Sequence, residues 1–156
     1  MQIWMDGDAC PGEVKDLLFR TAQRRKIHLT VVANLSIRIP RSPHIDSMVV
    51  GAGANLADLR IVELLAPGDL VVTADIPLAA AVVKKGGLAL NPRGELYTEH
   101  NVGDRLATRN MMDDLRGGGQ ITGGPSNYSQ KDKQAFANQL DRWVTRMLRC
   151  DATGDA

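Results

Sequence analysis

The sequence predicts one α/β domain in which a mainly parallel sheet of four to five strands lies between two layers of helices. Short apolar runs alternate along the chain with amphipathic segments, as in parallel strands joined by crossover helices. Two of these runs end in an aspartate that is soon followed by a proline suited to a first helical turn, at Asp6 and Pro11 and again at Asp75 and Pro77. The 156 residues suit a single domain, 1–150, followed by a disordered C-terminal tail, 151–156.

Each element is predicted from its local pattern. Strands are expected where short runs of Val, Ile and Leu stop at Gly, Pro, Asn or Asp, and helices where apolar residues recur every three or four positions. The predicted strands are 3–5, 27–33, 45–50, 69–75 and 88–90. The predicted helices are 13–25, 54–66, 78–85, 101–116 and a last one that begins with a Ser129/Asp132 capping pair. The segment 91–100 is expected to be a loop that lies over the carboxyl ends of the strands, where a ligand site would be. The segment 117–125 is expected to be a flexible connector.

The composition excludes several classes of protein. Nineteen basic and 18 acidic residues give a net charge of +1, so any surface for nucleic acid must be local rather than global. Cys10 and Cys150 form no disulfide framework, and neither belongs to a C-x-x-C pair. No signal peptide and no apolar stretch of membrane-spanning length is recognised. A cytoplasmic protein without membrane contact is therefore expected, and the sequence does not fix its oligomeric state.

Four aspartates are expected to converge. Asp6, Asp8 and Asp75 follow strands, and the carboxyl ends of parallel strands meet at one edge of the sheet, where ligands bind. Asp58 falls on the apolar stripe of its helix, where a carboxylate needs a partner. An ordinary alternative remains for each, because aspartates are also common in turns and near helix N-termini.

Converging carboxylates without His or Cys at metal-ligand spacing favour Mg²⁺ or Mn²⁺. Such a site suits phosphodiester chemistry, in which the ion activates water. Asn34 and Thr73, at strand ends, are candidates to hold a carboxylate or a phosphate oxygen, and Arg93 is a candidate substrate contact in the loop. All three also suit purely structural roles.

Several motifs resemble those of the bacterial YaiI/YqxD family. They are Asp6-Gly-Asp8-Ala-Cys10-Pro11, Val32-Ala-Asn34, Ala57-Asp58, the segment 68–79, Asn91-Pro-Arg93-Gly94 and Thr122-Gly-Gly-Pro125. The family is uncharacterised in activity and is similar in fold to PIN domains, whose acidic clusters hold Mg²⁺ or Mn²⁺ and cut RNA. The resemblance implies a PIN-like ribonuclease with Asp6, Asp58 and Asp75 as catalytic acids. Asp8 completes the implied metal-ligand set through the family's opening motif.

Two alternatives stay open. Asp6-x-Asp8 after an apolar strand resembles the nucleophile motif of haloacid-dehalogenase-like phosphatases, although Cys10 stands where Thr or Val is expected and Gly68-Asp69 precedes a strand instead of following one. The second alternative is a non-catalytic RNA-binding or interaction module that keeps the PIN-like shape. The net charge of +1 and the few aromatic residues give little sign of strong single-strand binding, and they count against a nuclease as well.

Overall fold

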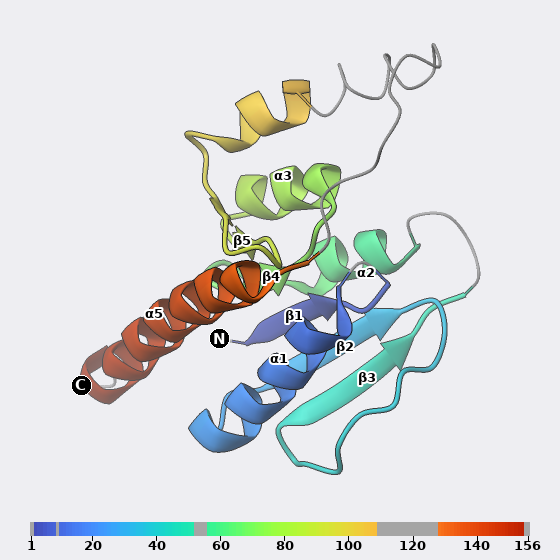
Figure 1. Cartoon of the computed structure of the whole chain (residues 1–156), viewed down its shortest axis with the longest axis vertical. Coiled ribbons are helices and arrows are strands. Elements are labelled where there is room, and N and C mark those ends of the chain that lie inside the picture. Colours follow the sequence, from blue (N-terminus) through green and yellow to red (C-terminus); the bar gives the residue numbers. More distant parts are fainter. Residues whose placement is uncertain (1, 9, 52–55, 109–127, 155–156) are drawn as a thin grey trace.

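The computed structural model describes residues 2–8, 10–51, 56–108 and 128–154. Six strands form one sheet in the order β3-β2-β1-β4-β5-β6, with β1 at its centre (Figure 1). The strands are β1 (Ile3–Asp6), β2 (Leu29–Ala33), β3 (Ile45–Val49), β4 (Leu70–Val72), β5 (Leu88–Leu90) and β6 (Leu96–Tyr97). The first five are parallel, which confirms the mainly parallel α/β sheet. Their carboxyl ends therefore share one edge.

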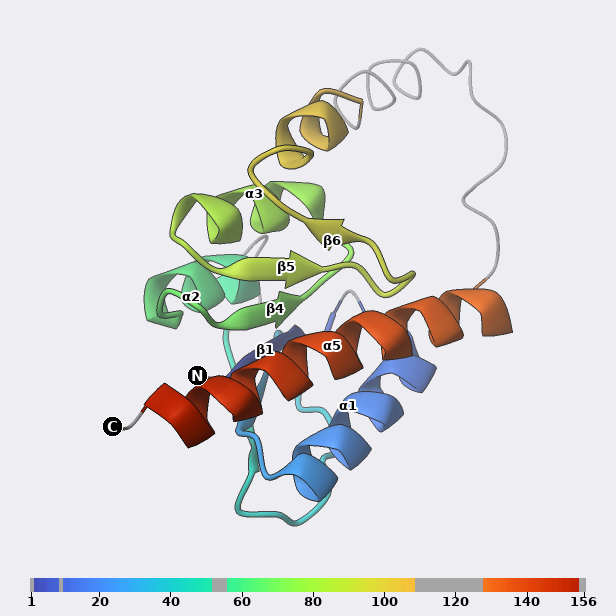
Figure 2. The ribbon, with the colours of Figure 1, turned by 90° about the vertical axis from the view of Figure 1, so that its left-hand side faces the viewer.

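Helices cover both faces of the sheet. The bounds are α1 (Gly12–Arg25), α2 (Leu56–Leu64), α3 (Ile76–Lys84) and α5 (Gln130–Gly154), and residues 102–108 are also helical. One apolar core joins α1 and α5 to the sheet, and these two helices pack side by side (Figure 2). A second core joins α2 and α3 to the opposite face. The three-layer arrangement is therefore as predicted.

Side-chain alternation along β1 explains the two cores. Ile3 and Met5 belong to the core under α1 and α5, whereas Trp4 belongs to the core under α2 and α3. Since successive side chains of a strand point to opposite faces, Asp6 follows Trp4 toward α2 and α3. The same alternation in β4 places Val71 on this face, and Thr73 directly beyond the strand is expected there too.

The structure differs from the predicted elements in three places. Within the expected loop 91–100, Leu96–Tyr97 forms β6, which pairs antiparallel with β5. Tyr97 is almost fully buried there. Pro11 is the residue before α1 instead of part of its first turn. The last helix continues to Gly154 and so includes residues 151–154 of the expected tail.

Other predictions are confirmed or lie outside the described residues. Pro77 is in the first turn of α3, and Ser129 and Asp132 cap α5 reciprocally through their side chains and backbone N–H groups. The expected start of the second helix at residue 54, the expected helix beyond 108 and the expected connector 117–125 are not described. Among the described residues, no helix is long and apolar enough to cross a membrane.

Candidate functional site

Asp6 lies at the carboxyl end of the central strand and is only 3% exposed. Its carboxylate accepts hydrogen bonds from the Thr73 hydroxyl, at 2.9 Å, and from the backbone N–H of Asp8. Burial raises the pKa of Asp6, the two hydrogen bonds lower it, and the charges of Asp8 and Asp75 raise it further. The net effect is a raised pKa, because desolvation outweighs the hydrogen bonds.

Thr73 connects Asp6 with Asp75. The Thr73 side chain is completely buried, and its hydroxyl oxygen also accepts the backbone N–H of Asp75 at 3.0 Å. The Asp75 carboxylate in turn accepts the backbone N–H of Leu78 at 2.9 Å and caps α3. Thr73 therefore holds the Asp6 carboxylate in place, and its side chain has no exposed surface that a phosphate could contact.

Asp58 is the most perturbed acid of this group. It lies in the first turn of α2, half-buried beside Ala57 and Ile61 of the apolar core, as its position on the apolar stripe predicted. Burial, the charges of Asp6 and Asp75, a hydrogen bond with Asp75 and the charge of Asp8 together raise the pKa of Asp58 to about 7. All three other aspartates thus act on Asp58, so folding brings the four predicted acids into one electrostatic cluster.

Asp8 lies at the exposed side of this cluster, which we call the Asp cluster (Asp6, Asp8, Asp58 and Asp75). The Asp8 carboxylate accepts the backbone N–H of Asn34 at 2.9 Å, so the end of β2 is attached to the end of β1. The side-chain oxygen of Asn34 is buried, and no hydrogen-bond partner for it is found among the described residues. Asn34 therefore approaches the cluster through its backbone.

The Asp cluster has an excess of negative charge. No ion pair within 4 Å connects any of its four members to a Lys, Arg or His of the described residues. Four carboxylate donors suit a hard cation by their chemistry. However, no three His, Cys, Asp or Glu side chains in the described part of the chain are arranged so that they hold a metal ion. The structure thus gathers the acids without forming a metal centre.

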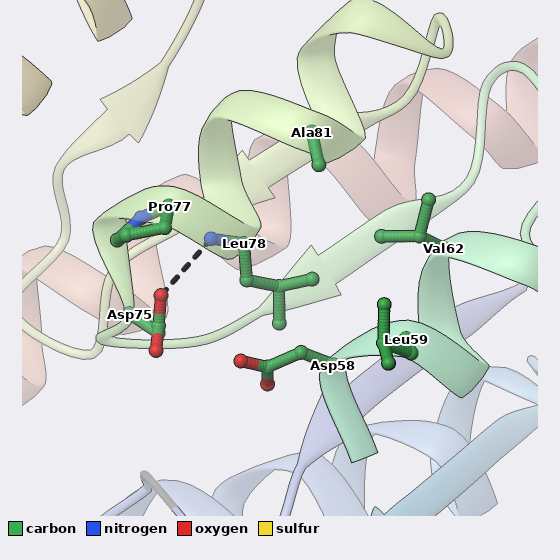
Figure 3. Close-up of a pocket in the computed structure, with 7 residues that line it drawn as sticks. All are labelled: Asp58, Leu59, Val62, Asp75, Pro77, Leu78 and Ala81. Atoms are coloured by element: carbon green, nitrogen blue, oxygen red, sulfur yellow. Dashed lines mark hydrogen bonds between the residues drawn. The ribbon is translucent and has the colours of Figure 1, made fainter. Parts of the chain in front are cut away.

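An open pocket adjoins the cluster. It has a volume of about 430 Å³ and lies between α2 and the N-terminal part of α3 with its cap residue Asp75. The described residues that line it are Asp58, Leu59, Val62, Asp75, Pro77, Leu78 and Ala81. Figure 3 shows the carboxylates of Asp58 and Asp75 on one side of the view and Leu59 and Val62 on the other. Sequence patterns do not predict this pocket, because it depends on how two helices pack.

Arg93 has a different environment. It follows β5, and its guanidinium forms an ion pair with Asp132 at the start of α5, with an N–O distance of 2.8 Å. Its backbone N–H is bound by the side chain of Asn91. The contact with Asp132 attaches the β5–β6 turn to α5, which is a structural role for this arginine.

Two buried groups near β4 have structural roles. Asp69 accepts hydrogen bonds from the Trp4 indole N–H and the backbone N–H groups of Gln2 and Ala66, at 3.0, 3.1 and 2.9 Å. It precedes β4, at the end opposite the Asp cluster. The Cys10 thiol donates to the carbonyl of Val72, and burial raises its pKa. Cys10 therefore remains a thiol and is unsuited to act as a nucleophile.

Comparison with known proteins identifies close relatives. The sequence model described as "Uncharacterized BCR, YaiI/YqxD family" matches residues 4–146. A UPF0178 protein of Maridesulfovibrio salexigens is 57% identical over 148 residues, covering 95% of this chain and 98% of the relative. A UPF0178 protein of Shewanella baltica is 56% identical over 146 residues, covering 94% and 97%. No solved structure matches the chain. The protein belongs to the YaiI/YqxD family.

Proposed function

We propose that this protein is a divalent-metal-dependent phosphodiesterase of PIN-like type that cleaves a nucleic-acid backbone, with RNA as the expected substrate. The observation that carries the proposal is the convergence of the four aspartates at the carboxyl edge of the sheet, where burial and the surrounding acids raise the pKa of Asp58 to about 7. An acid whose pKa is raised by burial and by neighbouring acids, at the carboxyl edge of a parallel sheet, is typical of a functional site. The resemblance to PIN domains, whose acidic clusters cut RNA with Mg²⁺ or Mn²⁺, supports the same activity.

The carboxylates of the Asp cluster are the groups that would hold the ion, after they draw closer around it than they lie in this structure. Their oxygen donors match the preference of Mg²⁺ and Mn²⁺, and a cation would offset the repulsion that raises the pKa of Asp58. When bound, the ion would activate water and stabilise charge on the phosphate. Thr73 would position both acids through its hydroxyl group, which donates to the Asp6 carboxylate and accepts from the backbone N–H of Asp75.

The test begins with metal binding. If Mn²⁺ binds the folded protein alone, a concentration of about 100 times Kd stabilises it by about 2.7 kcal/mol, which raises Tm by roughly 5–10 °C. Asp75→Asn should abolish this shift. Asparagine caps a helix as well as aspartate does, so the variant is expected to keep α3 intact. Asp16→Asn is the matched control, because Asp16 is an exposed aspartate of α1 outside the cluster.

The second measurement is cleavage of labelled RNA and DNA oligonucleotides with Mn²⁺ and with EDTA. We expect metal-dependent cleavage of RNA by the unchanged protein and by Asp16→Asn, and none by Asp75→Asn. If Mn²⁺ neither shifts the Tm nor supports cleavage of any substrate, the proposed phosphodiesterase activity is rejected.

That negative result would favour a non-catalytic RNA-binding or interaction module. One observation supports this second candidate, since no three metal-ligating side chains of the described residues are arranged around a common point. The phosphatase alternative has less support. Its late acidic residue would correspond to Asp69, whose carboxylate is occupied by Trp4 and two backbone N–H groups at the opposite end of β4.

A further inference from the structure

The pocket between α2 and α3 combines an apolar wall with an acidic end. Five of the seven described residues that line it are apolar, and Asp58 and Asp75 are the other two. Leu59 on this wall is 62% exposed. Pockets of roughly 300–1,000 Å³ with apolar walls and a few polar groups are typical of small-molecule sites. The pocket of about 430 Å³ belongs to this class.

The charge of the pocket restricts what enters it. No Lys, Arg or His is among the described residues that line it, so the pocket itself offers no counter-charge to a phosphate. Carboxylate oxygens instead accept hydrogen bonds from N–H and NH₂ groups. One oxygen of Asp75 accepts from Leu78 N, and Asp75 also shares a hydrogen bond with Asp58, so the two carboxyl groups together retain further acceptor capacity. An anion is therefore disfavoured, and the occupant should be apolar on its faces and rich in N–H donors at one edge.

We propose that this pocket binds an uncharged nucleobase of the substrate, held between α2 and α3 while the neighbouring phosphate lies at the Asp cluster. This assignment rests on the proposed phosphodiesterase function. The faces of the base would contact Leu59 and Val62 on one side and Leu78 on the other, and its amino or imino group would donate to Asp58 or Asp75. Contact with a base would also cover the exposed side chain of Leu59 and remove its apolar surface from water.

The pocket is tested first without metal or phosphate. Calorimetric titrations in EDTA compare adenosine with ribose, which lacks the base, and with n-butylamine, which tests whether the acidic end selects a cation. Adenosine is expected to bind at least about tenfold more tightly than either, a difference of about 1.4 kcal/mol. Equal or weaker binding of adenosine would overturn the assignment.

A matched pair of variants locates the binding. Ala81→Leu fills the pocket, whereas Ala80→Leu adds the same side chain to the adjacent half-buried position of α3, which does not line it. Leucine is a good helix former at both positions. We expect Ala81→Leu to weaken adenosine binding at least about tenfold more than Ala80→Leu does. A similar effect of both variants would place adenosine elsewhere and refute the inference.

Cleavage then separates this inference from the proposed function. The unchanged protein with Mn²⁺ should cut an oligoribonucleotide more slowly, by at least about tenfold in kcat/KM, when a single abasic residue replaces the base beside the scissile phosphate. Equal cleavage of both substrates would refute the base pocket and retain the nuclease. Adenosine binding that Ala81→Leu removes, without cleavage of any substrate, would retain the pocket and reject the nuclease.

Discussion

Substituting Asp58 by asparagine should stabilise the protein in alkaline solution. Asparagine has nearly the shape of a protonated aspartic acid and carries no charge. The folded structure disfavours the ionised form of Asp58, because burial and three neighbouring acids raise its pKa from 3.8 to about 7. The unfolded chain does not oppose ionisation in this way. Above pH 7 the natural protein carries an ionised Asp58, which lowers its free energy of unfolding. Asp58→Asn has no charge at this position and avoids that loss.

The linkage between proton binding and folding gives the sign and size of the stability difference between Asp58→Asn and the natural protein. An acid whose pKa is raised on folding contributes fully below its unfolded pKa, and this contribution is lost as pH rises through the folded value. Each tenfold change in acidity corresponds to about 1.4 kcal/mol, so the full change sets an upper limit of about 4 kcal/mol. Solvent around the half-buried Asp58 weakens the repulsion, and we expect about 1–3 kcal/mol. The gain should develop between about pH 4 and pH 7 and stay constant above.

Urea denaturation followed by circular dichroism measures this difference. Free energies of unfolding are compared at about pH 4 and pH 8 in EDTA for the natural protein, Asp58→Asn and the exposed control Asp16→Asn. Subtraction between variants removes the pH dependence of groups that do not interact with Asp58. If Asp58→Asn is more stable than the natural protein by the same free energy at both pH values, the ionisation of Asp58 does not cost stability and the expectation is wrong. Mn²⁺ should reduce that advantage at pH 8, because it stabilises the natural protein.

Three further substitutions test individual contacts through the free energy of unfolding in urea. Thr73→Val keeps the side-chain shape but removes the hydrogen bond to Asp6, so it should lower the free energy of unfolding by about 1–3 kcal/mol. The same change should raise the pKa of Asp6, which NMR titration measures. Gly94→Ala should cost about 3 kcal/mol or more, because φ is 91° and a Cβ atom would lie 2.6 Å from the backbone of α5. Asp69→Asn should cost about 2–3 kcal/mol, because one carbonyl oxygen cannot replace a carboxylate that accepts three N–H groups, and tryptophan fluorescence should report the change.

The mainly parallel sheet and its acidic edge could be predicted from sequence because the strands, the crossover helices and the strand-end aspartates all show in local patterns. Asp6 and Asp75 terminate apolar runs, and parallel topology then places both at one edge. Asp58 was recognised by its position on an apolar stripe, which helical periodicity alone reveals. The assignment of the chain to two cores follows from strand alternation in the same way.

The features that could not be predicted depend on contacts between distant segments. β6 has only two residues, Leu96–Tyr97, and exists because β5 offers it a free edge. The pocket between α2 and α3 depends on the spacing of two helices, which the apolar pattern of either one does not specify. The ion pair of Arg93 with Asp132 joins residues 39 positions apart, and the sequence contains no signal for it.

Asp69 and Asp58 show why residue type alone does not identify a functional acid. Both are aspartates partly or wholly removed from water, but Asp69 is surrounded by three N–H donors, which satisfy its charge. Asp58 is surrounded by other carboxylates, which oppose its charge. An acid of the first kind stabilises the fold, since its ionised form has its partners within the chain. An acid of the second kind costs stability until a proton or a cation is added. That unsatisfied charge is the physical reason to expect a ligand at Asp58 and none at Asp69.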